Sequence, residues 1–286
     1  MDGHGHRAAY SLKAPGRSSS DSLRLPGRGS FPRVDDHLVL PEVTRDEIIG
    51  GRRVVASPAH LPHAAQHTRL DYVLEAHVAP GYQAATDLLT RHDEESDFAS
   101  DTCVFKEGSD PATGARYLEE MAFEVVSEQD ERDVTEKAVR MHRRGVRRIF
   151  AIFVKGQRVC EWSAESQSWR PLDFGSRIED PSLVTPLGVA ALLDAAAAHH
   201  AVVEALAAQG DPTLRQREAA AEARGEARGE ARGRAESILD LLAARDIAMS
   251  EAQRAEVLRS EDTARLSRWL RRAALASTAA QVLEEP

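Results

Sequence analysis

Residues 119–137, EEMAFEVVSEQDERDVTEK, limit what the chain can fold into more than any other stretch, because they combine a strand, a turn and a helix. Side chains alternate between the two faces of a strand, so Met121, Phe123 and Val125 share one apolar face and Glu124 lies on the other. Glu is rarely buried unless it is paired or bound to a cation. A strand whose polar face is open to water would give the same pattern, and the pattern alone leaves both interpretations open.

The helix predicted directly after this strand carries a lysine on its inward side. Val134, Ala138 and Met141 have the i, i+4, i+7 spacing of a stripe that packs on a core. Lys137 lies on the same side of the helix. A lone lysine on such a stripe often extends its amine to solvent, but beside an inward Glu124 it indicates a functional site.

A second acidic residue, Asp101, lies upstream in another strand-like stretch, ASDTCVF. Two carboxylates on adjacent strands can hold one Mg²⁺, which prefers a few carboxylates and several waters. The metal would neutralise the scissile phosphate and lower the pKa of the attacking water. Lys137 could orient that water or stabilise the developing negative charge. Asp101, Glu124 and Lys137 therefore predict a metal-dependent nuclease centre.

Strand and helix signals alternate over the first two thirds of the chain, which favours an α/β layer fold. The segment TRDEIIGGRRVVAS suggests a helix end or turn, a Gly-Gly hairpin signal and then a strand. The other expected elements are a helix over about 62–78, strands over 82–89, 98–105 and 117–127, a helix over about 131–144, and a strand pair around Gly156. An Ala-rich helix is expected over Leu187–Ala208.

The composition changes along the chain and predicts five segments. These are a disordered leader (1–40), a nuclease-like domain (41–180), a helical segment (181–212), a low-complexity helix or linker (213–236) and a small helical tail (237–286). The leader is rich in Gly, Ser, Pro and Arg and buries too little apolar surface to offset its ordering entropy. The linker repeats EARG three times, and each helical glycine costs about 1 kcal/mol, so we expect a frayed, solvated helix there. The sequence assigns no partner to the tail.

The overall composition excludes several classes of protein. The net charge of −9 argues against a protein that coats nucleic acid non-specifically. Cys103 and Cys160 form no CxxC pair, so neither a disulfide framework nor a zinc ribbon is expected. Because the chain has no run of about 18 apolar residues and no signal-peptide core, we expect a cytoplasmic protein without a membrane segment.

Other catalytic motifs receive less support. The sequence contains no Walker loop, GxGxxG or GxSxG, which argues against NTPase, dinucleotide-binding and serine-hydrolase functions. His63 and His67 have the i, i+4 spacing of a helical metal site, but the HExxH glutamate is missing. Histidines at such positions are more often ordinary surface or core residues.

The predicted helix after Glu124 and the residues that follow it are locally basic. Residues 131–148 contain seven basic and three acidic side chains, and a surplus of this kind can engage a phosphate backbone. The candidate contacts are Arg140, Arg143, Arg144 and Arg147. A solvated helix face explains the same arginines equally well.

An Asp, a Glu in an apolar strand and a nearby Lys resemble the PD-(D/E)XK nuclease superfamily. More narrowly, Glu47 in DEIIGG, then Asp101, FEVVS, and RDVTEK before GVRRIFAIFV are similar to the Uma family of restriction endonucleases. In that family the lysine lies on the helix after the strand. Here Val126 stands where the usual motif has lysine, and Lys137 supplies the charge. The resemblance covers roughly residues 41–175.

The resemblance implies a restriction endonuclease-like fold, in which helices flank a mixed β-sheet core, here with an all-helical C-terminal extension. It implies that Asp101 and Glu124 bind Mg²⁺ or Mn²⁺, that Lys137 is the catalytic lysine and that Glu47 is an auxiliary acid. The expected activity is hydrolysis of phosphodiester bonds in nucleic acid, with DNA as the expected substrate. Cutting two strands would suit a homodimer, which remains an open alternative.

Two departures from the family pattern keep a non-enzymatic alternative open. Ser100 stands where the family usually has proline before the aspartate, and Glu128 stands where it often has proline. Neither change removes a predicted ligand. The alternative is a catalytically degenerate nuclease fold that acts as a binding or regulatory module through its helical tail.

Overall fold

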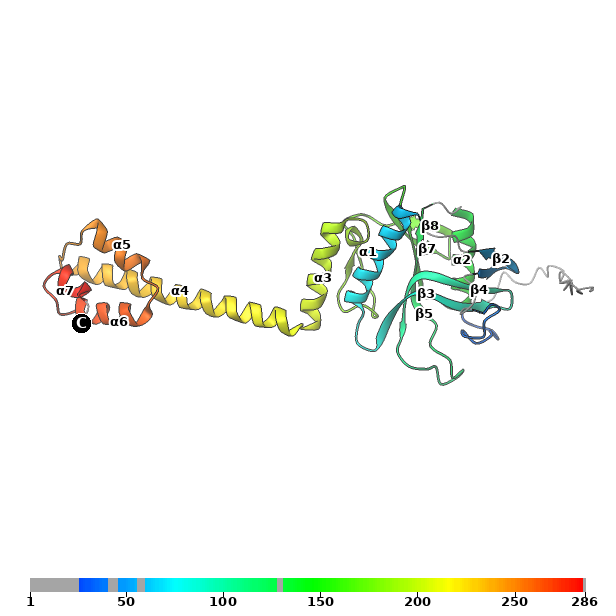
Figure 1. The fold of residues 1–286 in the computed structure, drawn as a ribbon, viewed down its shortest axis with the longest axis horizontal. Coiled ribbons are helices and arrows are strands. Elements are labelled where there is room, and N and C mark those ends of the chain that lie inside the picture. The colour runs from blue at the N-terminus through cyan, green and yellow to red at the C-terminus, as the bar shows by residue number, and fades with distance from the viewer. Residues whose placement is uncertain (1–25, 41–45, 56–59, 128–130, 285–286) are drawn as a thin grey trace, which may run out of the picture. The chain divides into compact units, whose positions relative to one another are not determined.

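The computed structural model describes residues 26–40, 46–55, 60–127 and 131–284. The chain divides into two compact units, Met1–Ala208 and Gln209–Pro286. The first unit contains an eight-stranded sheet in the order β2-β1-β4-β5-β6-β7-β8, with β3 paired to β4 (Figure 1). Its strands are β1 (Asp46–Ile49), β2 (Arg52–Val55), β3 (Tyr82–Asp93), β4 (Ser96–Lys106), β5 (Glu119–Val126), β6 (Arg148–Phe153), β7 (Arg158–Ser163) and β8 (Ser168–Pro171).

The sheet is mixed, because β5 and β6 run parallel while the other neighbouring strands run antiparallel. A parallel pair needs a crossover, and α2 (Glu131–Arg144) supplies it. Helix α1 (Leu61–His77) precedes β3. A mixed sheet flanked by helices confirms the predicted α/β class.

The two helices cover opposite faces of β5 (Figure 1). Met121, Phe123 and Val125 belong to the core cluster that also contains the buried residues of α1. Ala122 packs in the cluster that contains Ala138 and Met141 of α2. The alternation along β5 therefore directs Glu124 to the α2 side of the sheet.

The observed α2 has the predicted bounds. Val134, Lys137, Ala138 and Met141 are its buried residues, which is the inward stripe that the spacing predicts. The helix ends where Gly145 adopts a φ of 118° and donates its N–H to the carbonyl of Met141 at 3.1 Å. A positive φ is accessible to glycine without steric cost, which explains the stop.

The Gly-Gly hairpin signal is confirmed, but the residues before it, expected to be a helix end or turn, form β1. Gly50 and Gly51 have φ values of 58° and 75°, as a type I′ turn requires at both central positions. The hairpin joins β1 to β2, and Ile48 of β1 pairs with Asp97 of β4. This pairing brings Glu47 of β1 next to β4.

The hairpin between β3 and β4 is longer than predicted. The sequence predicts strands over 82–89 and 98–105, but β3 continues to Asp93 and β4 begins at Ser96. Arg91 explains the difference, because its buried guanidinium donates to the carbonyls of Asp36, Asp93 and Glu94 at 2.8, 2.6 and 2.9 Å. A satisfied polar side chain can continue a strand that hydropathy alone would end.

Residues 26–40, which belong to the predicted leader, include residues that contact the sheet. Val34 is buried, and its carbonyl accepts the N–H of Arg91 at 2.9 Å. Asp97 accepts the N–H of Leu38 at 2.6 Å and lies 3.0 Å from Nδ1 of His37. Residues 1–25 of the predicted leader lie outside the described residues.

The Ala-rich segment is not one continuous helix. It comprises β10 (Leu187–Gly188), which pairs with β9 (Arg177–Ile178), then the 3₁₀ turn η2 (Val189–Leu192) and α3 (Ala195–Gln209). The side chain of Asp194 accepts the N–H of Ala197 at 2.8 Å, so Asp194 caps the start of α3. A local capping residue thus sets the boundary that alanine content alone does not reveal.

The second unit is helical. It contains α4 (Pro212–Ala244), α5 (Glu251–Arg259), α6 (Thr263–Ala273) and α7 (Ala279–Leu283). Asp211 caps α4, which runs without interruption through the EARG repeats. Residues 222–230 are exposed, and the core of this unit begins at Ala231. None of the described helices is both long enough and apolar enough to cross a membrane.

Candidate functional site

The register of β4 and β5 brings the two predicted metal ligands together. Thr102 pairs with Phe123, so Asp101 and Glu124 are the next residues on the two antiparallel strands. The carboxylate of Asp101 accepts the backbone N–H of Val125, directly after Glu124. Asp101 is half-buried at this point.

Glu124 is a buried carboxylate without hydrogen-bond donors. Its relative exposure is 1%, and neither carboxylate oxygen has a hydrogen-bond partner among the described residues. Burial raises its pKa to about 8, and the nearby carboxylates of Asp101 and Glu47 act in the same direction, while Lys137 opposes them. Such a carboxylate is costly to fold unless a cation compensates it.

Lys137 extends from α2 into this acidic cluster. Its Nζ lies 3.1 Å from Oε2 of Glu47 and 3.6 Å from Oε2 of Glu124, and it donates to the carbonyl of Ala99 at 3.0 Å. Burial by itself would lower the pKa of Lys137, but the carboxylates of Glu124 and Glu47 outweigh it and raise the pKa. The amine is therefore a fixed positive charge.

Glu47 connects Lys137 to β4. Besides its contacts with the amine, its Oε1 accepts the backbone N–H of Ala99 at 2.9 Å. Ala99 thus contributes its N–H to Glu47 and its carbonyl to Lys137. The structure brings Glu47, Asp101, Glu124 and Lys137 together from β1, β4, β5 and α2.

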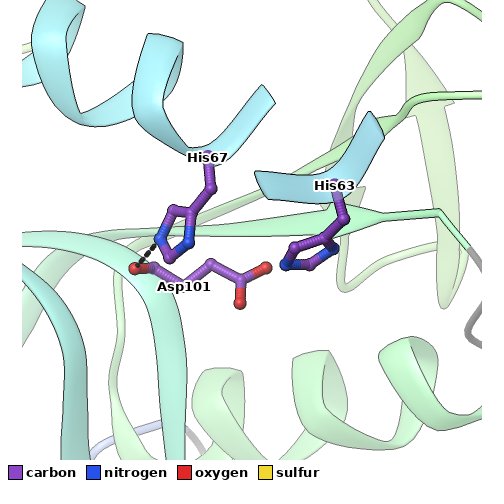
Figure 2. Close-up of side chains that lie close together, drawn as sticks. All are labelled: His63, His67 and Asp101. Atoms are coloured by element: carbon purple, nitrogen blue, oxygen red, sulfur yellow. Dashed lines mark hydrogen bonds between the residues drawn. The ribbon is translucent and has the colours of Figure 1, made fainter. Parts of the chain in front are cut away.

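His63 and His67, which the sequence alone did not favour as metal ligands, lie beside Asp101. One ligand atom from each of His63, His67 and Asp101 lies within 4.8 Å of the others. Figure 2 shows both rings directed from α1 toward Asp101, and Nε2 of His67 lies 2.7 Å from the backbone carbonyl of Asp101. The i, i+4 spacing was visible in the sequence, but the third residue lies in a distant strand.

Three of the four candidate arginines already have partners within the protein. Arg140 contacts Asp93 at 2.8 Å, Arg144 donates to the carbonyl of Pro32 at 2.8 Å, and Arg147 pairs with Glu120 and Asp180. Arg143 is exposed at the end of α2. A contact with nucleic acid through these arginines stays a prediction.

The departures from the family pattern do not displace the acidic residues. Ser100 is buried in β4, where its hydroxyl lies 3.9 Å from the sulfur of Met141. Asp101 follows it and keeps its bond to Val125. Glu128, the second departure, lies outside the described residues.

Comparisons with known proteins found a family model and a solved structure that match this chain. A solved structure, a "putative nuclease belonging to DUF820" from Anabaena variabilis, is 17% identical with a TM-score of 0.44, covering 52% of this chain and 89% of its own. No curated protein matches the chain. The model of the Uma2 family, described as "Putative restriction endonuclease", matches residues 34–196. Because residues 34–196 are more than half of this chain, the chain belongs to the Uma2 family of nucleases.

Proposed function

We propose that this protein is a Mg²⁺-dependent DNA endonuclease, in which Asp101 and Glu124 bind the metal and Lys137 is the catalytic lysine. The observation that carries the proposal is the carboxylate of Glu124, which is buried, has no hydrogen-bond donor among the described residues and lies beside a buried lysine. Perturbed, incompletely compensated carboxylates of this kind are concentrated at functional sites.

The residues present fit a hard divalent cation. Carboxylate oxygens are the ligands that Mg²⁺ and Mn²⁺ prefer, and Asp101 and Glu124 lie beside each other on neighbouring strands. A cation between them would add positive charge beside Glu124, for which Lys137 at 3.6 Å only partly compensates. When bound, it would polarise the scissile phosphate and lower the pKa of a coordinated water.

Lys137 would act as a fixed charge. Its raised pKa makes the neutral amine of a general base inaccessible near neutral pH, and a protonated amine suits the negative charge that develops on phosphate. Glu47 would be a positioning residue, because it holds the amine at 3.1 Å and is itself fixed by the N–H of Ala99. This favours charge stabilisation over activation of the water by Lys137.

The family's description, which names restriction endonucleases, supports DNA as the proposed substrate, because restriction endonucleases cut DNA. The exposed side chain of Arg143 is the candidate phosphate contact that has the fewest constraints within the protein. A phosphate contact positions the duplex and contributes to affinity without selecting a sequence.

The test is nicking of supercoiled plasmid by the full chain with Mg²⁺, with Mn²⁺ or with a chelator. Glu124→Gln keeps the shape of the side chain and removes its charge, so we expect the rate to fall at least about 100-fold. Glu120→Gln is the matched control, because Glu120 lies on the same strand and contacts Lys106 and Arg147 instead.

Each outcome separates the proposal from its alternative. Equal nicking by the wild type and Glu124→Gln would refute the assigned site. A wild type that neither nicks plasmid nor binds Mg²⁺ would favour the degenerate fold that acts as a binding or regulatory module. Nicking that depends on Mg²⁺, survives Glu120→Gln and is lost in Glu124→Gln would support the proposal.

A further inference from the structure

We propose that His63, His67 and Asp101 form a second divalent-cation site, selective for metals that prefer imidazole, such as Zn²⁺ and Co²⁺. The site shares Asp101 with the proposed magnesium centre, but its existence does not rest on nuclease activity. It adds two neutral nitrogen ligands from α1, an element that contributes nothing to the Glu47–Lys137–Glu124 cluster.

The backbone already holds the three side chains in position. His63 and His67 are one turn apart on α1, so their side chains lie on the same face of the helix. Their rings lie edge to face, with centroids 5.9 Å apart and an interplanar angle of 74°, so they do not stack on each other. One ligand atom of each histidine and one of Asp101 lie within 4.8 Å of one another.

Hydrogen bonds select the ring nitrogens that can bind a metal. A carbonyl oxygen only accepts, so Nε2 of His67, 2.7 Å from the carbonyl of Asp101, carries the proton, and Nδ1 keeps its lone pair. Nδ1 of His63 lies 3.4 Å from the hydroxyl of Ser127, which leaves Nε2. Figure 2 shows these two remaining nitrogens on the side of the Asp101 carboxylate.

This arrangement is typical of metal-binding histidines. Such residues usually donate their second ring N–H to a carbonyl or carboxylate, which fixes the tautomer and the ring orientation. Here the carbonyl that fixes His67 belongs to the same residue that offers the carboxylate. One residue of β4 therefore orients one ligand and supplies another.

Accessibility and charge are also suitable. All three residues are partly exposed, so a cation can reach them from solvent. The site lies near the N-terminus of α1, whose partial positive charge opposes a cation, so binding should depend strongly on the charge of Asp101. The Val125 N–H fixes the carboxylate in place.

The ligand set determines the metal. Two imidazoles and one carboxylate suit Zn²⁺ and other first-row divalent ions, whereas Mg²⁺ takes oxygen ligands. Three protein ligands leave a position for water or substrate, as in catalytic rather than structural zinc sites. The proposed magnesium centre and the histidine site should therefore differ in metal preference.

The test is titration of the full chain with Co²⁺, followed by visible d–d absorption and by competition with Zn²⁺. His4 and His6 are replaced by alanine in every protein tested, because they lie outside the described residues and could bind the same ions. We expect His63→Ala to weaken Co²⁺ binding at least about 10-fold, since even outer-shell changes typically cost 10–100-fold.

A second variant guards against misfolding. In His67→Gln the side-chain amide can still donate to the carbonyl of Asp101, while the Nδ1 lone pair is lost, so binding should also weaken at least about 10-fold. The matched control is His200→Ala. His200 is exposed on α3 and pairs with Glu204 at 3.3 Å, so its removal should leave Co²⁺ affinity unchanged.

The results distinguish this site from the proposed magnesium centre. Unchanged Co²⁺ affinity in both His63→Ala and His67→Gln would overturn the proposal. So would loss of binding in Glu124→Gln alone, because the ion would then lie between Asp101 and Glu124. Co²⁺ binding that depends on the histidines, in a protein that does not nick plasmid, would keep this site and refute the nuclease proposal.

Discussion

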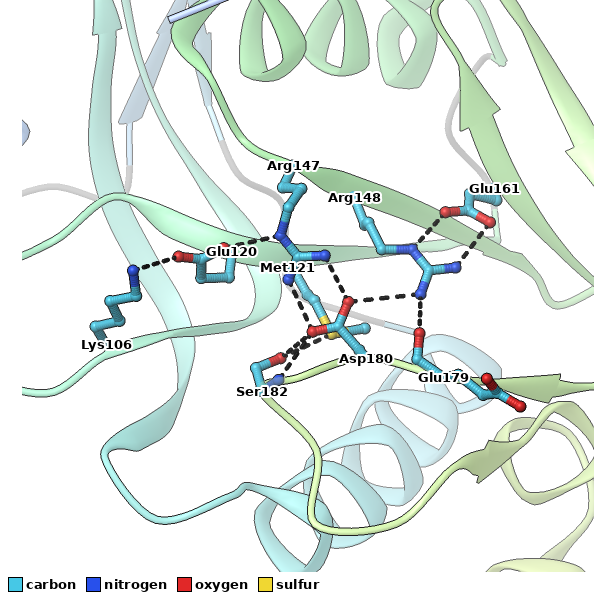
Figure 3. A network of polar contacts seen from close by, with 9 residues as sticks. All are labelled: Lys106, Glu120, Met121, Arg147, Arg148, Glu161, Glu179, Asp180 and Ser182. Carbon is cyan, nitrogen blue, oxygen red and sulfur yellow. Dashed lines mark hydrogen bonds and ion pairs between the residues drawn. The ribbon is translucent and has the colours of Figure 1, made fainter.

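Two groups of buried acidic side chains in the first unit show opposite electrostatics. The carboxylate of Asp180 has no exposed surface, pairs with Arg147 at 2.8 Å and accepts from the hydroxyl of Ser182 at 2.7 Å (Figure 3). These contacts outweigh burial and lower its pKa to about 2. The side chain of Glu124 is only 1% exposed, its carboxylate accepts no hydrogen bond from the described residues, and its pKa rises to about 8.

The difference lies in whether the fold itself supplies hydrogen-bond donors to a buried acid. Buried polar groups in folded proteins are nearly always hydrogen-bonded, and the Asp180 group follows that rule. Arg148 belongs to the same network: its guanidinium lies 3.5 Å from Asp180 and binds both oxygens of Glu161 at 2.6 and 3.0 Å. The Glu124 group violates the rule, which is expected where a ligand or substrate completes the site.

The largest expected effect on stability comes from removing the ammonium of Lys137, which lies beside Glu124 and Glu47. Lys137→Met leaves Glu47 and Glu124 without the amine between them, so we expect unfolding free energy to fall by about 3–5 kcal/mol at about pH 8.5. The loss should be smaller at about pH 6, where Glu124 can protonate. Urea unfolding at both pH values measures it. Lys106→Met, which removes an exposed pair with Glu120, should change stability by less than about 1 kcal/mol.

The next effect is the pH dependence of stability due to Glu124. Its folded pKa of about 8 lies above the ordinary value of 4.5, so its contribution is fully present below about pH 4.5 and is lost as pH rises through 8. Between about pH 5.5 and 8 the wild type should lose about 3 kcal/mol more than Glu124→Gln. Urea unfolding of both proteins across this pH range measures the difference, and identical pH dependence would contradict the raised pKa of Glu124.

Asp180→Asn tests the satisfied group and should have an intermediate effect. Because charge-assisted hydrogen bonds are weakened, we expect a loss of about 2 kcal/mol at neutral pH. The pH dependence has the opposite sign, since a lowered pKa gives stability that is present above about pH 3.8 and lost as pH falls through 2. Plasmid nicking should be unchanged, and a large loss of nicking without unfolding would contradict a purely structural role.

The smallest expected effect is that of Arg147→Gln. The side chain of Arg147 is 42% exposed, and Asp180 keeps Arg148 and Ser182 as partners after its removal. The loss of stability should therefore stay below about 1 kcal/mol. Urea unfolding measures this loss. A loss of stability as large as that of Asp180→Asn would mean that Arg148 and Ser182 cannot replace Arg147 as partners of Asp180.

Local periodicity accounts for what the sequence could predict. The alternation around Glu124 and the spacing of Val134, Lys137 and Met141 depend only on strand and helix geometry, so the inward faces could be predicted from the sequence. The Gly50-Gly51 turn is equally local. These signals are sufficient to place Glu124 and Lys137 on facing elements of an α/β fold.

Features that depend on distant contacts were not predictable in this way. His63 and His67 form a candidate metal site only together with Asp101. Strand pairing places Asp101 close to them, and no local sequence pattern predicts that pairing. The extension of β3 depends on carbonyls that satisfy Arg91, including that of Asp36 in the preceding segment. Contacts with residues distant in sequence therefore determine the histidine cluster and the length of β3, which composition and periodicity do not predict.

The attachment of residues 26–40 has a consequence for any shortened form of the protein. Asp97 is fully buried, and the N–H of Leu38 and the ring of His37 lie on its two carboxylate oxygens. A chain trimmed to begin after residue 40 would leave that carboxylate without these two partners. Asp97 precedes Ala99, which holds both Glu47 and Lys137, by two residues. Trimming a segment that looks dispensable by composition would thus loosen β4, the strand that carries Asp101 of the proposed metal site.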